Sequence, residues 1–319
     1  MTILQADTGK DQTLLAAYSP RDAKWDHHRA NAQAIGQHYD QEQRFARLGE
    51  RIAGCSTALG FAWHDDHDTG ESRLKLRTAS FCCVRHCPVC QWRRSLRNTA
   101  RFFSAIPALQ AQFPTHRWIF LTLTVRNCEP DQLRDTITAM NTGWKRLIQR
   151  KDWPALGWCR TVEVTRNDED GSAHPHFHAL LMVPAGYFTG RNYITQAEWS
   201  ARWRHAMRLD YDPVVDVRAV KSKKDGQTLQ AAVVETLKYA TKAEDSLNDP
   251  EWLYAITEQL HKLRFIATGG ALKDLLKDDM TNAEMIAGDE AETATKSEPS
   301  MWFGWQPVQK KYTRTKPKP

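Results

Sequence analysis

Residues 174–183 have the sequence HPHFHALLMV, in which a histidine-rich segment runs directly into an apolar one. Side chains alternate between the two faces of an extended strand, so His176 and His178 are predicted to point to one face and Phe177 to the other. Two imidazoles on one face form half of a metal site. The simpler interpretation is a histidine-rich strand end whose ring nitrogens make ordinary hydrogen bonds.

The preceding segment supplies a candidate third ligand. Residues 161–166 also alternate, and an Asp-Gly pair in the segment that follows is a strong turn signal. A hairpin closed at that turn would pair Arg166 with Ala173 or its neighbour. This pairing brings Glu163 opposite His176. Two imidazoles and a carboxylate suit a catalytic divalent cation with open positions; phosphate chemistry would favour magnesium or manganese there, with zinc as an alternative.

Length and composition narrow the class of protein. The chain has 319 residues, enough for one large domain or two, and 41% of them are hydrophobic. No window approaches about eighteen apolar residues, so we expect no membrane span. The N-terminal segment does not resemble a secretory signal, which makes a cytoplasmic location the default expectation. Seven cysteines, an odd number with clustered spacing, indicate metal binding rather than a disulfide framework.

Positive charge is concentrated in residues 72–128. The net charge of the chain is only +6, but this block contains no Asp or Glu and ten Arg or Lys residues. Solvated surfaces normally mix both signs, whereas an arginine-rich block of one sign suits a phosphate-bearing partner. Nucleic acid is the predicted partner, with acidic metabolites or a partner protein as alternatives. The candidate DNA contacts are Arg85, Arg93, Arg94 and Arg97.

A cysteine-rich segment lies inside this block. Residues 82–90, CCVRHCPVC, contain a Cys-Pro-Val-Cys knuckle, whose spacing lets two thiolates and backbone amides wrap one tetrahedral ion. A structural zinc is favoured over a redox pair, because no thioredoxin-like strand precedes the motif. The predicted zinc ligands are Cys55, Cys82, Cys87 and Cys90, with Cys83 and His86 as competitors. The helix expected at residues 91–105 would then begin at the zinc site, with Trp92, Leu96 and Phe103 inward and several arginines outward.

The second half of the chain predicts an α+β fold. Strands are expected at residues 117–125, 158–166, 174–183 and 213–220, with helices at residues 129–150 and from a capping box at 195–198 to about residue 209. The order βαββαβ is the ferredoxin-like or RRM-like arrangement, in which an antiparallel sheet carries helices on one face. The zinc-binding segment would be a small module beside it.

A later helix, expected at residues 228–245, carries three polar side chains on one stripe. Glu235, Tyr239 and Lys242 stand at positions i, i+4 and i+7. A free phenol, with a pKa of about 10, is a poor nucleophile. A catalytic tyrosine therefore needs a cation or a base beside it. The alternative is an amphipathic helix with a half-buried tyrosine and ordinary surface charges.

These motifs together resemble a known family. The segments at residues 82–94, 120–125, 163–165, 174–178 and 235–242 occur in the order seen in plasmid rolling-circle replication initiators. The chain is similar to the branch of the HUH endonuclease superfamily that has one catalytic tyrosine and a glutamate four residues before it. The resemblance covers residues 51–270.

The resemblance implies an HUH nuclease fold and a nicking-closing reaction at a DNA origin. The metal ligands would be Glu163, His176 and His178, with His174 as a possible substitute in the metal shell. Tyr239 would attack the phosphorus at the nick site, leaving a 5′-phosphotyrosine and a free 3′-hydroxyl for a polymerase. Glu235 would activate water when the round ends, and Lys242 would orient phosphate.

The implied partners are single-stranded and hairpin origin DNA, with a host polymerase. A host helicase is also expected, because the sequence contains no Gly-x-x-x-x-Gly-Lys-Ser/Thr motif. Two rival classes are an HUH transposase or relaxase, and a zinc-stabilised DNA-binding protein without catalysis. The Cys-Pro-Val-Cys module and the spacing of Glu235 and Tyr239 favour replication over the first rival.

The sequence suggests four segments. Residues 1–50 would be a helical or flexible extension, residues 51–105 the zinc-binding basic module, and residues 106–277 the HUH endonuclease domain. Residues 278–319 would be an acidic linker followed by a basic tail with aromatic residues.

Overall fold

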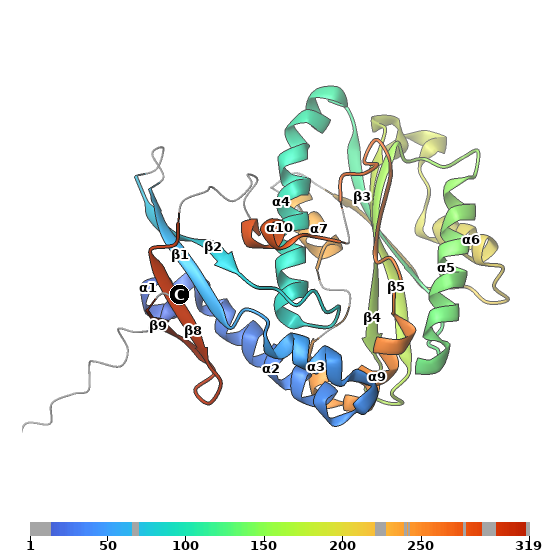
Figure 1. Ribbon diagram of the computed structural model, residues 1–319. Coiled ribbons are helices and arrows are strands. Elements are labelled where there is room, and N and C mark those ends of the chain that lie inside the picture. Colours follow the sequence, from blue (N-terminus) through green and yellow to red (C-terminus); the bar gives the residue numbers. More distant parts are fainter. Residues whose placement is uncertain are drawn as a thin grey trace, which may run out of the picture. The chain divides into compact units, whose positions relative to one another are not determined.

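In the computed structural model the histidine-bearing segment is the central strand of a five-stranded antiparallel sheet, with the order β6-β3-β5-β4-β7 (Figure 1). Helices α5 and α6 connect the strands in the predicted order βαββαβ, and β7 extends the sheet beyond β4. The α+β class is therefore confirmed. The bounds are β3 Arg117–Thr124, α5 Leu133–Ile148, β4 Gly157–Arg166, β5 Ala173–Val183, α6 Gln196–Met207, β6 Val215–Val220 and β7 Ile266–Gly270.

The structure describes residues 14–65, 70–220, 228–238, 241, 243–276, 279–288 and 298–316. The chain divides into two compact units, each with its own sheet. The first unit comprises Met1–Arg97 and Met280–Pro319, and the second comprises Asn98–Asp279. The four segments suggested by the sequence do not coincide with these two units.

The β4–β5 hairpin has the predicted register. Arg166 pairs with Ala173 across the turn, and Glu163 pairs with His176. Because side chains alternate along each strand, this register sets which residues share a face. It places Glu163, His176 and His178 on the same face of the sheet.

Helices cover both faces of this sheet (Figure 1). On one face Phe177 and its neighbours pack against α5 and α6, where Trp144, Trp199 and Trp203 are buried. The sequence predicted helices on one face only. On the other face an apolar cluster around Leu180 also needs cover, and the later part of α4 and helix α7 provide it, with bounds α4 Pro88–Gln112 and α7 Leu229–Thr236.

The predicted continuous helix at residues 228–245 is interrupted. Helix α7 ends at Thr236, and helix α8 covers Ala243–Asn248. Between them Thr241 forms a parallel bridge with Val164 of β4, which requires extended backbone and is incompatible with a helix. Tyr239 and Lys242 lie outside the described residues.

The first unit contains a four-stranded sheet with the order β2-β1-β8-β9. Its strands are β1 Ala58–Asp65, β2 Ser72–Ala79, β8 Met301–Gln306 and β9 Lys311–Thr315. The sequence predicted a basic tail in the region of β8 and β9. The strands form there because Met301, Phe303 and Trp305 alternate with more exposed residues, so that one side of β8 is buried.

Helices complete the two units. The longest in the N-terminal region is α2 Lys24–Gln41, which buries Trp25 and Ile35. The remaining helices are α1 Leu15–Tyr18, η2 Pro20–Ala23, η3 Gln43–Phe45, α3 Ala46–Ala53, η4 Pro130–Gln132, η5 Ala185–Phe188, η6 Gly190–Asn192, α9 Pro250–Gln259 and α10 Asn282–Ala287. Within the described ranges, every helix is too short or too polar to span a bilayer.

Candidate active site and metal centres

Glu163, His176 and His178 meet on one face of the second unit's sheet. The Nε2 atoms of His176 and His178 lie 3.1 Å and 2.7 Å from the same carboxylate oxygen, Oε2 of Glu163. All three side chains are buried. Ligand atoms about 2.1 Å from one octahedral magnesium or manganese ion lie about 3.0 Å apart, which matches this spacing. We call these three residues the triad.

The other ring nitrogens of the two histidines hold the rings in place. Nδ1 of His176 lies 3.3 Å from the carbonyl oxygen of His174, and Nδ1 of His178 lies 3.2 Å from Oγ1 of Thr122. A carbonyl oxygen only accepts hydrogen bonds, so a proton on Nδ1 of His176 would meet the carbonyl of His174 and leave Nε2 for a metal ion. Both Nε2 atoms hydrogen-bond with the Glu163 carboxylate here, and a cation coordinated by all three groups would take the place of the protons between them. The donor set therefore fits a divalent metal ion.

Glu163 is ionised in these surroundings. Burial by itself raises the pKa of its carboxyl, but the hydrogen bonds with His176 and His178, and their charge, hold the pKa well below its usual range. His174 lies outside the triad, and its Nδ1 is 2.7 Å from Oδ1 of Asn127. Burial, together with the charge of His176, lowers the pKa of His174.

Lys238 connects the triad with Glu235. Its Nζ lies 2.7 Å from Oε1 of Glu235 and 3.3 Å from Oε2 of Glu163. Burial acts to lower the pKa of Lys238, but the hydrogen bond with Glu235 and the two carboxylate charges raise it overall. The ammonium group is therefore charged at neutral pH. The sequence pattern singled out Lys242 instead; the position of Lys238, three residues after Glu235, was the overlooked signal.

The described residues on either side of Tyr239 are attached to β4 near the triad. Oγ1 of Thr161 donates a 2.7 Å hydrogen bond to the carbonyl oxygen of Thr236. After Tyr239, Thr241 bridges Val164. Thr161 and Val164 stand two residues before and one residue after Glu163 in β4.

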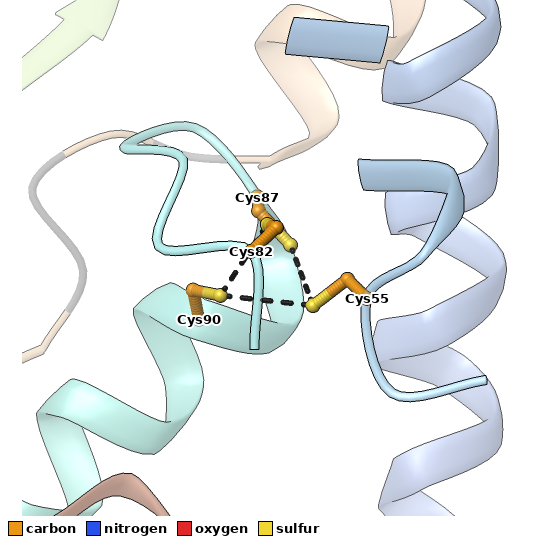
Figure 2. Close-up of side chains that lie close together, drawn as sticks. All are labelled: Cys55, Cys82, Cys87 and Cys90. Carbon is orange, nitrogen blue, oxygen red and sulfur yellow. Dashed lines mark hydrogen bonds between the residues drawn. The ribbon is translucent and has the colours of Figure 1, made fainter. Parts of the chain in front are cut away.

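Four cysteine sulfurs converge in the first unit (Figure 2). The Sγ atom of Cys55 lies 3.7 Å from those of Cys87 and Cys90, and Sγ of Cys82 lies 3.6 Å from that of Cys90. Tetrahedral zinc with Zn–S distances of about 2.3 Å separates its ligand sulfurs by about 3.8 Å. These four residues, the four-cysteine cluster, are the set predicted from the sequence, and they fit one tetrahedral ion.

The cluster joins three segments of the first unit. Cys55 follows α3, Cys82 lies in the loop after β2, and Cys87 and Cys90 stand at the start of α4. The backbone N–H of Val84 donates to Sγ of Cys82, as in metal knuckles. Hydrogen bonds from the neighbouring thiols lower the pKa of Cys90 well below its usual value. Thiolate character in a buried group of sulfurs suits metal binding.

The two competing ligands lie outside the cluster. Cys83 is exposed and has a left-handed backbone, with a φ angle of 56°. His86 is buried, and burial lowers its pKa to about 3, but it does not belong to the group of converging ligand atoms.

Comparison with known proteins identifies the family. The family model described as "Replication protein" matches residues 73–313, which include three of the four cluster cysteines and the whole triad. The chain belongs to this replication protein family. The resemblance to plasmid replication initiators that the motifs suggested is thereby confirmed.

Several curated relatives of this replication protein carry the name Protein rep. The one from Bacillus amyloliquefaciens is 36% identical over 284 residues, which cover 80% of this chain and 81% of the relative. The one from Lactiplantibacillus plantarum is 36% identical and covers 77% of this chain and 81% of the relative. The one from Lentilactobacillus hilgardii is 38% identical, with coverage of 72% and 75%. No solved structure matches the chain.

The arginines predicted to contact DNA occupy different environments in this replication protein. Arg93 and Arg97 are buried, so the expectation that they point outward is wrong. Arg93 donates hydrogen bonds to the carbonyl oxygens of Met285 and Ile286 in α10 and lies over the rings of Trp25 and Trp92. It therefore stabilises the first unit. Arg85 and Arg94 are only partly buried.

Proposed function

We propose that this chain initiates rolling-circle replication of a plasmid by nicking one strand of the origin and later rejoining it. The observation that carries the proposal is the convergence of Glu163, His176 and His178 beside Lys238. Membership of the replication protein family supplies the biological setting. The triad supplies a place where a phosphodiester can be activated.

The triad would hold a divalent cation with open coordination positions. Such a cation, when bound, withdraws charge from the scissile phosphate as a Lewis acid. The chain's own contribution is orientation: β4 and β5 fix the three ligands, and Thr122 and the carbonyl of His174 fix the rings. Oxygen and imidazole ligands suit magnesium or manganese, with zinc as the alternative.

Tyr239 is the proposed nucleophile. Its phenolic oxygen would form a bond to phosphorus while the bond from phosphorus to the 3′ oxygen breaks. The phenol loses its proton, and the departing 3′ oxygen gains one. The product is a 5′-phosphotyrosine and a free 3′-hydroxyl, so the energy of the diester is retained and strand rejoining needs no ATP. The attachment of Thr236 and Thr241 to β4 supports this assignment.

Charged groups beside the triad would control the second half of the reaction. Glu235 is the proposed base that takes a proton from water when a round of replication ends. Its ion pair with Lys238 keeps the carboxylate turned toward the triad. Lys238 is also a cation within reach of a phosphate bound at the triad, which is the role that the motif resemblance assigned to Lys242.

The four-cysteine cluster is proposed to hold a structural zinc ion. Four sulfurs complete a tetrahedral shell and leave no position for a substrate. The cluster would stabilise the start of α4 and the loop before it. The proposed partners of the whole protein are single-stranded and hairpin origin DNA, together with a host helicase and polymerase.

The test is a covalent-adduct assay with labelled single-stranded origin DNA and manganese. We expect the wild-type protein and Tyr193→Phe, a control at an exposed tyrosine, to form an adduct, and Tyr239→Phe to bind DNA without forming one. An adduct in Tyr239→Phe would move the nucleophile to another residue. DNA binding without an adduct in the wild type would indicate a non-catalytic DNA-binding protein. Strand transfer that does not depend on the origin would indicate a transposase or relaxase.

A further inference from the structure

A cavity of about 700 Å³ opens where the C-terminal ends of α5 and α6 meet in the second unit. Gly143 allows this close approach, because a Cβ atom there would collide with the side chain of Met207. Arg146 joins the two ends by donating a 3.0 Å hydrogen bond to the carbonyl oxygen of Ala206. The lining residues are Arg146, Arg150, Arg204, His205, Ala206, Arg208 and Leu209.

Neighbouring carboxylates neutralise only part of the positive charge that the lining arginines carry. Asp152 pairs with Arg150 and also with Arg202 just outside the cavity, each at 2.9 Å, and Asp212 pairs with Arg204 at 3.0 Å. In the described part of the chain, neither Arg146 nor Arg208 has a carboxylate partner. Both are exposed. The cavity therefore retains a positive potential.

Capping of the helix ends accounts for part of the arginine content, but not for all of it. Each helix C-terminus carries about half a negative charge, and a cation near it is stabilising. The two ends together offset about one of the arginine charges. Arg146 fulfils that role by its bond to Ala206. Arg208 is left over, at a left-handed helix cap with a φ angle of 60°.

The cavity is separated from the triad. The triad shares the face of the sheet with Leu180, whereas α5 and α6 cover the opposite face. Helix α5 follows the end of β3 at Thr124, which pairs with His176. Trp203 of α6, next to the lining residue Arg204, donates a 2.8 Å hydrogen bond from its ring N–H to the carbonyl oxygen of this Thr124, so the sheet itself separates the cavity from the triad. A phosphate bound in the cavity would thus be a different one from the scissile phosphate.

We infer that this arginine-lined cavity is a second DNA site, which binds the phosphodiester backbone of duplex DNA away from the nick. This inference rests on the proposed function, because it takes DNA as the partner. Guanidinium groups suit phosphate oxygens, which they bind in pairs. The site would hold the origin in place without reading its bases.

The test uses the double variant Arg146→Gln/Arg208→Asn in the full chain. Glutamine keeps a donor for the carbonyl of Ala206, and asparagine tolerates the left-handed backbone at the cap. The matched control, Arg191→Gln/Lys273→Gln, removes two exposed positive charges elsewhere in the second unit. Thermal melting verifies that both variants fold.

Binding to a duplex of about 30 base pairs, roughly three helical turns, is measured against salt concentration. Loss of two phosphate contacts lowers the slope of log affinity against log salt by about 1.8. The loss of affinity between about 50 mM and about 200 mM salt then becomes about 12-fold smaller than in the wild type. We expect this change in the cavity variant and not in the control.

Cleavage of a single strand of about 10 nucleotides across the nick site should be unchanged in the cavity variant, because so short a strand occupies the triad alone. An unchanged salt slope, or an equal fall in the control, overturns the inference. Inorganic phosphate that binds the cavity without competing with duplex would indicate a small-anion site and also overturn it. Displacement of inorganic phosphate from the cavity by polyglutamate, but not by duplex DNA, would overturn it as well. If the wild type binds duplex with the expected slope but never forms an adduct, the proposed function fails and the cavity assignment stands.

Discussion

The two candidate metal centres differ in how completely the protein surrounds the ion. The four-cysteine cluster supplies four ligands from three segments of the first unit. The triad supplies three ligands from two adjacent strands and has Lys238 and Glu235 beside it. Structural zinc sites are closed, whereas catalytic sites keep an open position. We therefore propose that the cluster contributes stability and the triad contributes chemistry, and the following variants test this difference.

Removal of a cluster ligand should have the largest effect on stability. In Cys87→Ser we expect loss of bound zinc and unfolding of the first unit, because a structural zinc contributes about 10 kcal/mol or more to folding. Zinc content and thermal melting measure the change. Cys83→Ser, at the exposed neighbour outside the cluster, serves as the control and should match the wild type. Wild-type zinc content in Cys87→Ser would refute the ligand set.

Removal of a triad ligand should separate activity from stability. We expect His178→Ala to lower the rate of nicking by at least about 100-fold, since even the partners of metal ligands are worth 10-fold to 100-fold. The melting temperature with zinc in the cluster should change little by comparison. A variant that melts like Cys87→Ser would show that the triad is also a structural site.

Removal of the hydroxyl group that contacts the second ring nitrogen of His178 should have a smaller effect on nicking. Thr122→Val removes the hydroxyl that faces Nδ1 of His178 and keeps the shape of the side chain. We expect the manganese concentration for half-maximal nicking to rise about 10-fold to 100-fold. Thr142→Val, on the exposed side of α5, is the control. Equal manganese requirements in both variants would mean that Thr122 does not orient the ligand.

The smallest expected effect concerns the ion pair at the end of α7. Lys238→Gln should slow nicking by up to about 5-fold, because an ion pair this exposed to solvent is worth about 1 kcal/mol or less. It should also change the ratio of hydrolysed to rejoined product, because Glu235 loses its partner. Quantifying both products from a suicide substrate tests this. A uniform loss of both products would indicate that Lys238 acts on phosphate alone.

Local signals made the hairpin and the ligand sets predictable. Alternation on both strands and an Asp-Gly turn leave one register that buries the apolar residues, and this register brings Glu163 to His176. The Cys-Pro-Val-Cys spacing likewise predicted two members of the four-cysteine cluster. Cys82 and Cys55 were chosen over Cys83 and His86, and the sulfurs of these two residues converge with those of Cys87 and Cys90.

Features that depend on distant contacts were not predictable from local pattern. The buried side of β8 alternates clearly, but its partner β1 lies more than two hundred residues earlier in the sequence. Arg93 belongs to a residue type that is normally exposed. It is buried because α10 presents carbonyl oxygens and tryptophan rings lie beside it. Likewise, the break after Thr236 follows from the contacts of Thr161 and Val164 with that segment.

The pairing of β8 with β1 has a consequence for synthesis of the protein. Because the first unit combines Met1–Arg97 with Met280–Pro319, its sheet cannot be completed until the ribosome has translated the whole of the second unit. Domains generally fold as they emerge, so the second unit can fold while β1 still waits for its neighbour. A chain cut short before β8 would carry an intact triad on an unfinished first unit. Only a chain translated through β8 could therefore complete the native fold of the first unit.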